Sequence, residues 1–100
     1  MWREDDYIAV MSRLRRQIIV HSVIYYHFNR NLILDGEYDE LCVKLYKMQQ
    51  EHPLLCQHAA FAEDFIDYDP STGMNFAEHE WGLRAANRLL NSIVGGRRRG

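Results

Sequence analysis

Long hydrophobic runs are missing from this 100-residue sequence. The longest apolar stretch, residues 17–24, is interrupted by polar side chains and falls well short of the about 18 residues that a membrane-spanning helix needs. The N-terminus carries Glu4, Asp5 and Asp6 where a secretory signal peptide carries basic residues. The sequence therefore predicts a cytoplasmic protein with no membrane partner.

Cysteine is scarce, and the patterns that bind metals are missing. Cys42 and Cys56 form no Cys-x-x-Cys pair, and the five histidines form neither a His-Glu-x-x-His nor a His-x-x-x-His motif. A disulfide is disfavoured in the reducing compartment expected above. Both cysteines are predicted to be buried free thiols, and no metal site is expected.

Lysine is also scarce, because the chain has two, Lys44 and Lys47, and its 12 Lys and Arg residues are outnumbered by 14 Asp and Glu, which gives a formal net charge of −2. Such a chain is not expected to bind nucleic acid, although the three arginines within residues 95–100 are typical of a flexible basic tail. The composition, 47% hydrophobic and 26% charged, is that of a soluble globular protein. Residues 1–94 are predicted to form a single helical domain.

Apolar residues at helical spacing occupy much of the chain. Between residues 7 and 28 they recur at steps of three and four, which predicts one helix of about six turns. Its end is expected near residues 29–31, because Asn29 and Asn31 favour left-handed or turn conformations. The residues on this face are Tyr7, Met11, Leu14, Ile18, His21, Tyr25 and Phe28.

A second helix is predicted to begin with Asp35 as its N-cap and to end at His52, because Pro53 disfavours helix for the residue before it. Pro53 is expected to start a shorter third helix. The second helix presents one face of Tyr38, Leu41, Leu45, Met48 and His52, and the third presents Leu55, Ala59, Ala62, Phe65 and Ile66.

A last helix is predicted to be capped by Asn75 and to end at Gly95–Gly96. Its expected buried face is Trp81, Ala85, Leu89 and Ile93, with Gly82 and Ala86 allowing a close approach. No segment shows the alternation of a strand. The fold class is therefore all-α, a small bundle of three to four helices with a helix–loop–helix corner at residues 25–40.

This corner brings together the residues of the candidate site, Tyr25, Tyr26, Asp35, Tyr38 and Asp39. Aromatic faces attract a flat cation such as a pyridinium ring, and carboxylates add charge attraction and accept hydrogen bonds from sugar hydroxyls. Adjacent helical residues point about 100° apart, so only one of the two neighbouring tyrosines can stack on a ligand.

Structural roles compete with binding at several of these positions. Tyr25 and Tyr38 lie on apolar helix faces and are equally explained by core packing. Asp35 is explained as an N-cap, whereas Asp39 is a first-turn acid. His21 is interpreted as a hydrogen-bonded core histidine rather than a phosphate ligand.

Residues 17–55 resemble the N-terminal helical domain (domain Ia) of bacterial NAD-dependent DNA ligases. The resemblance is carried by an aromatic pair, a short loop, an Asp-x-Glu-Tyr-Asp motif, two leucines and a Glu-His-Pro ending. In this sequence they are Tyr25-Tyr26, Asp35-Gly36-Glu37-Tyr38-Asp39, Leu41, Leu45 and Glu51-His52-Pro53. The resemblance implies a domain that holds the nicotinamide mononucleotide half of NAD. It also implies that Tyr25, Tyr26, Asp35, Tyr38 and Asp39 contact this ligand.

The sequence departs from the ligases where their chemistry resides. Ligase adenylation uses a lysine nucleophile in a Lys-x-Asp-Gly motif, and neither Lys44 nor Lys47 lies in one. The Pro-Asp-Ser-Pro-type linker that follows domain Ia in the family is also missing after Leu55. The chain is therefore expected to be no enzyme and to require no cofactor.

Three functions remain open. The first is a non-enzymatic binder of NAD or nicotinamide mononucleotide, for example a sequestering or counter-defence protein. The second is a protein–protein interaction or inhibitor module, for example a viral one, that kept only the helical scaffold. The third is an accessory subunit that works in trans with a nucleotidyltransferase or ligase core.

Overall fold

The computed structural model describes residues 1–70 and 76–99, with side chains as far as Ile93. Three α-helices dominate it, α1 (Glu4–Tyr26), α2 (Asp35–Glu51) and α3 (Glu80–Arg99). Two short 3₁₀ helices, η1 (Pro53–His58) and η2 (Glu63–Phe65), lie between α2 and α3. The described residues contain no strand, so the predicted all-α class is confirmed.

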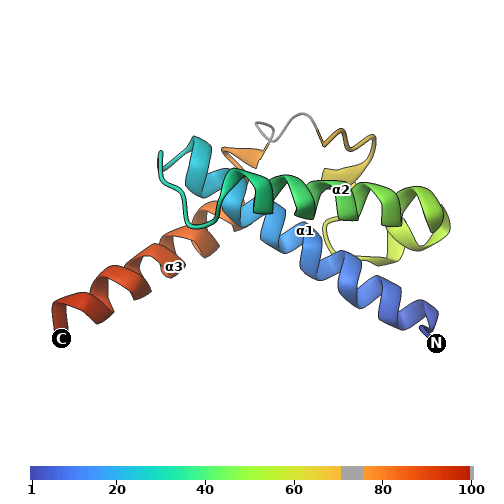
Figure 1. Ribbon diagram of the computed structural model, residues 1–100, viewed down its shortest axis with the longest axis horizontal. Helices are drawn as coiled ribbons and strands as arrows, with labels where there is room; N and C mark the ends of the chain where they lie inside the picture. The colour runs from blue at the N-terminus through green and yellow to red at the C-terminus, as the bar shows by residue number, and fades with distance from the viewer. Residues whose placement is uncertain (71–75, 100) are drawn as a thin grey trace.

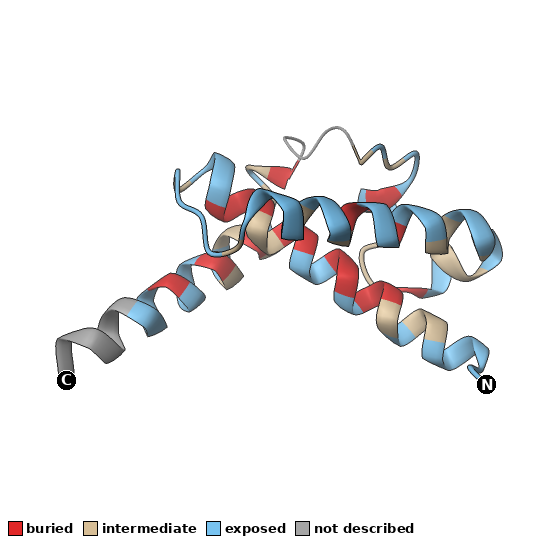
Figure 2. Cartoon of the chain, viewed as in Figure 1, coloured by how far each residue is buried: buried red, intermediate tan, exposed pale blue. Residues whose placement is uncertain are grey.

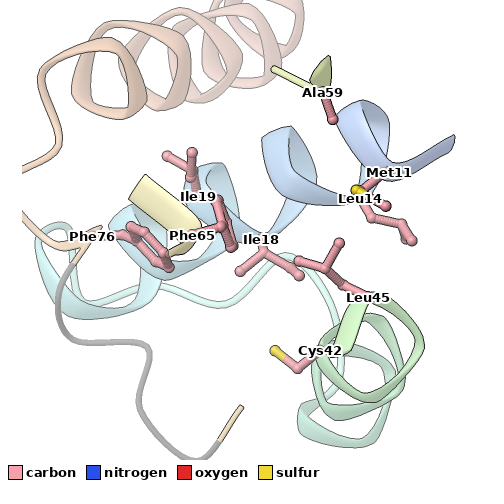
Figure 3. Packing of buried hydrophobic residues seen from close by; sticks show 9 residues of the cluster. All are labelled: Met11, Leu14, Ile18, Ile19, Cys42, Leu45, Ala59, Phe65 and Phe76. Carbon is pink, nitrogen blue, oxygen red and sulfur yellow. The ribbon is translucent and has the colours of Figure 1, made fainter. Parts of the chain in front are cut away.

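Helix α1 lies at the centre, with α2 along one side and α3 packed near its C-terminal end (Figure 1). The middle of the predicted face is buried, but Tyr25 near its end is exposed, and burial extends onto positions beside the predicted face, as the buried colour along this helix shows (Figure 2). Ile18, Cys42, Leu45, Phe65 and Phe76 are among the residues of the main core cluster (Figure 3). The cluster therefore joins α1 and α2 to the segment that follows η1.

The predicted third helix begins at Pro53 as expected, but it is the short 3₁₀ helix η1, followed by η2, rather than one helix that continues to Ile66. The side chain of Arg15 explains the difference. Its Nη1 donates to the carbonyl oxygens of Cys56 (3.0 Å), Ala59 (3.3 Å) and Ala60 (3.0 Å). Carbonyls in an α-helix accept from the amide four residues later, whereas these three accept from a side chain of α1. Phe61 then adopts a left-handed conformation, with φ of 60°, which interrupts any helix.

Helix α2 begins and ends close to its predicted bounds. Its N-cap is Leu34, which has extended backbone angles and whose amide donates to Oε1 of Glu37 (2.9 Å). The prediction of Asp35 as N-cap is therefore wrong by one residue, because Glu37 supplies the capping interaction. Glu51 is the last residue of the helix and His52 follows as its C-cap, as the position of Pro53 predicted.

The buried face of α3 differs from the predicted one. Gly82, Ala86 and Leu90 are buried, whereas Leu89 and Ile93 are exposed. The buried stripe is thus shifted by one residue, which turns the helix by about 100°. Small side chains at positions 82 and 86 let α3 approach α1 closely.

The two ends of α3 were predicted at Asn75 and at Gly95–Gly96. Asn75, the predicted cap, lies outside the described residues, and the amide of Gly82 instead donates to Nδ1 of His79 (3.1 Å). The predicted end at Gly95–Gly96 is wrong, because the helix continues to Arg99. Glycine lowers helix stability by about 1 kcal/mol but, unlike proline, removes no backbone donor. No helix in the described part of the chain combines the length and the hydropathy of a membrane span.

Candidate functional site

The corner between α1 and α2 is held by backbone hydrogen bonds to the last turn of α1. The amides of His27 and Phe28 both donate to the carbonyl oxygen of Val23, at 2.8 and 3.2 Å. Asn29 has a φ of 54°, the left-handed conformation predicted for this position. This turn reverses the chain, and the amide of Arg30 donates back to the carbonyl oxygen of Ile24 (3.0 Å). The loop is therefore fixed to the helix that precedes it.

A pocket of about 300 Å³ lies at this corner. Its lining comes from the last turns of α1, the loop, the first turn of α2 and one residue after η2. The lining residues are His21, Ser22, Tyr25, Tyr26, Arg30, Asn31, Leu32, Ile33, Asp35, Tyr38, Asp39 and Pro70. All five residues of the predicted site are among them, so the structure brings these residues together. Their contact with a ligand remains a prediction.

Tyr25 and Tyr26 form an exposed aromatic pair at the pocket. Their ring centroids are 4.7 Å apart and their planes meet at 85°, an edge-to-face arrangement. The rings retain 47% and 44% exposure, so Tyr25 does not belong to the core. The perpendicular planes agree with the expectation that only one ring can lie flat on a ligand.

Tyr38 belongs both to the core and to the pocket. Its ring packs against the main core cluster, and its hydroxyl is hydrogen-bonded to the hydroxyl of Ser22. Burial raises the pKa of Tyr38 well above its ordinary value, because removal from water disfavours the phenolate. The ring therefore presents a neutral phenol whose position is fixed by packing.

The two aspartates of the pocket are exposed, and within the described residues neither has a hydrogen-bond or ion-pair partner. Asp35 is the first residue of α2, and Asp39 lies one turn later on the same side of the helix. Both carboxylates are thus free to accept hydrogen bonds from a ligand. The described residues contain no cluster of three or more metal-ligating side chains.

Two further ionisable residues of the pocket, His21 and Arg30, were not among the predicted site residues. The buried Nδ1 of His21 has no hydrogen-bond partner in the described part of the chain, which contradicts its interpretation as a hydrogen-bonded core histidine. Burial lowers the pKa of His21, and the nearby charge of Glu37 partly opposes this effect. Helical spacing placed His21 on the apolar face of α1 but did not show that this residue lines the pocket.

Comparison with known proteins gives one family and one relative. A family model described as the DNA ligase-like, N-terminal NAD+-binding domain matches residues 4–60. A DNA ligase of Ehrlichia ruminantium (strain Welgevonden) is 23% identical over 91 residues, which are 91% of this chain and 13% of that ligase. The chain thus spans a small part of the length of this relative. No solved structure matches the chain significantly.

Proposed function

Because the chain belongs to the family of DNA ligase-like, N-terminal NAD+-binding domains, we propose that its corner pocket binds a nicotinamide-containing nucleotide without catalysing a reaction. The ligand is free nicotinamide mononucleotide or the corresponding half of NAD. The observation that carries this proposal is the convergence of three tyrosines and two exposed carboxylates on a single pocket.

The chemistry of the pocket suits the two parts of such a ligand. The oxidised nicotinamide ring is a flat cation, and contact with an aromatic face contributes about 0.5–2 kcal/mol. Asp35 and Asp39 attract this cation and can accept hydrogen bonds from the ribose hydroxyls. The pocket, at about 300 Å³, is at the lower end of the range for small-molecule sites. This size favours the mononucleotide half over the whole dinucleotide.

The residues of this sequence supply no ligase chemistry of their own. The chain has no Lys-x-Asp-Gly motif, so it offers no lysine of the kind that ligases use to form an enzyme–adenylate. A protein that holds the nucleotide and leaves it intact would lower the free concentration of that nucleotide. This role is that of a sequestering protein.

Titration calorimetry of the purified chain with nicotinamide mononucleotide tests the proposal. We expect saturable binding that is weakened roughly 10-fold or more in Asp39→Asn, because this change removes a carboxylate from beside the cation. Glu40→Gln is the matched control, since Glu40 is an exposed acid on the same turn that does not line the pocket. Absence of binding, or equal losses in both variants, would refute the proposed site.

A second function, binding to another protein, is favoured by a different observation. Leu89 and Ile93 on α3 remain 39% and 36% exposed, and this part of the helix extends away from α2 (Figure 1). An exposed apolar stripe on a helix is a common docking surface. This function would be favoured over the first if a specific protein co-purifies with the wild type but not with Leu89→Ser, and if the calorimetric titration shows no heat of nucleotide binding.

A further inference from the structure

The pocket is lined by more negative than positive side chains, which by itself disfavours a phosphorylated ligand. Asp35 and Asp39 are negative, and Arg30 supplies the one Arg or Lys side chain among the described residues of the lining. A nucleotide phosphate carries about −1.5 to −2 charges at neutral pH. The two carboxylates that attract the nicotinamide cation therefore repel the phosphate of the same ligand, and a phosphate needs a compensating cation.

Arg30 is placed to be that cation. It lies on the loop between the aromatic pair and the acidic motif, so it lines the pocket from a segment that carries neither the tyrosines nor the acids. The left-handed turn at Asn29 and the bond from the Arg30 amide to the Ile24 carbonyl fix its backbone against the end of α1. The pocket is thus bordered by acids at the start of α2 and by a base on the preceding loop.

The guanidinium group of Arg30 is available for a ligand. The residue is exposed, and within residues 1–70 and 76–99 its side chain has no hydrogen bond or ion pair. In particular, it does not neutralise Asp35 or Asp39. A free guanidinium presents a planar set of donors that matches two oxygens of one phosphate.

We infer that Arg30 is the phosphate-binding residue of the pocket and makes it selective for phosphorylated nicotinamide ligands over nicotinamide riboside. This inference rests on the proposed function and adds to it a specificity that neither the aromatic pair nor the acids can provide. The acids and rings bind the nicotinamide and ribose parts, which are common to both ligands. Only the phosphate distinguishes the nucleotide from the riboside.

The experiment compares nicotinamide mononucleotide with nicotinamide riboside on three versions of the full chain by titration calorimetry. The wild type is expected to bind the mononucleotide more tightly than the riboside. Arg30→Gln is expected to weaken mononucleotide binding roughly 10-fold or more and to leave riboside binding unchanged, because charge-assisted hydrogen bonds to the phosphate are lost. Arg16→Gln is the control, since Arg16 is an exposed arginine of α1 outside the pocket.

The outcomes separate this inference from the proposed function. Equal losses for both ligands in Arg30→Gln, or no loss for either, would overturn the role of Arg30 while leaving the nicotinamide site in place. A wild type that binds neither ligand would overturn the proposed function and this inference together. A thermal melt of Arg30→Gln that matches the wild type shows that the exposed substitution leaves the fold intact, so that any loss belongs to the phosphate contact.

Discussion

At the scale of the single residue, Tyr38 links the pocket to the interior. Its side chain packs on the main core cluster, its hydroxyl bonds to Ser22, and the residue also lines the pocket. The sequence offered core packing and ligand contact as alternatives for this tyrosine. The structure places it so that both can hold, because one face of a large ring can be buried while an edge remains accessible.

His21 gives a pH-dependent prediction. Burial lowers its pKa in the folded protein, so the unfolded chain binds a proton more readily. The associated stability is complete above the ordinary pKa of about 6.5 and is lost as the pH falls below that value toward the folded-state pKa. We therefore expect the melting temperature to fall more steeply between about pH 7 and about pH 5 in the wild type than in His21→Gln. Parallel slopes in the two proteins would contradict this assignment.

Sequence patterns located most of the pocket but not all of it. Tyr25, Tyr26 and the acidic motif stood out because rings and acids are conspicuous at a helix–loop–helix corner. Arg30 did not, since a lone arginine in a loop is ordinary and its role depends on the turn at Asn29. His21 was misjudged because helical spacing tells which side of a helix a residue faces, but not where along that side the core ends.

At the scale of the element, α3 shows how side-chain size sets the orientation of a helix. Two adjacent stripes of α3 were available to face α1, and the one with the smaller residues, Gly82 and Ala86, is buried. Ile19 and Val23 of α1 occupy the space that this stripe leaves. Periodicity located this helix and its close approach, but the choice between the stripes depends on the partner surface, which a sequence pattern does not contain.

Two glycines provide a matched test of this packing. A Cβ at Gly82 would lie 2.6 Å from Cγ2 of Ile19 and 2.9 Å from Cγ2 of Val23, whereas a Cβ at Gly36 meets nothing within 4 Å. We expect Gly82→Ala to lower the free energy of unfolding by about 1–3 kcal/mol, because overpacking outweighs the gain in helix propensity. Gly36→Ala, on the exposed first turn of α2, should raise it by about 0.4–1 kcal/mol.

Urea denaturation of the two alanine variants measures both effects. A stabilised Gly82→Ala protein would show that α1 and α3 can separate without cost, which would contradict the close contact described above. The opposite signs expected for the same chemical change make the comparison independent of the general preference of helices for alanine.

At the scale of the whole molecule, Arg15 joins three parts of the chain. Its side chain is 1% exposed and bonds to Oε1 of Gln49 on α2 through Nε (3.1 Å) and Nη2 (2.9 Å), besides the three carbonyls after η1 begins. The guanidinium lies 5.3 Å from the ring centroid of Phe65. Burial lowers the pKa of Arg15, since water no longer solvates its charge. Neutral oxygens thus take the place of water around a buried cation.

Arg15→Met tests this arrangement. The change removes the guanidinium that donates to the carbonyls of Cys56, Ala59 and Ala60, and we expect the free energy of unfolding to fall by about 3 kcal/mol. Arg16→Met is the matched control, because the neighbouring Arg16 is exposed and its loss should change stability by about 0.5 kcal/mol or less. Similar losses in the two variants, measured by urea denaturation, would show that Arg15 does not hold the η1 segment in place.

The segment after Pro53 is where prediction from sequence failed most, and Arg15 is the reason. Its residues have helical spacing, and Leu55, Ala59 and Phe65 suggested a continuous helix. The guanidinium of Arg15, 41 or more positions earlier in the sequence, donates hydrogen bonds to the backbone carbonyls of this segment instead. Local patterns carry no information about so distant a donor, whereas α1 and α2 are set by local spacing and were predicted close to their observed bounds.

The position of the pocket along the chain has a last consequence. Apart from Pro70, every lining residue lies between His21 and Asp39, so the site is built from one short, continuous hairpin. Closing so short a loop costs little chain entropy, and the hairpin brings its own shape wherever its two helices can pack. Such a hairpin is nearly self-contained: among the described residues that follow α2, Pro70 alone contributes to the lining of the pocket.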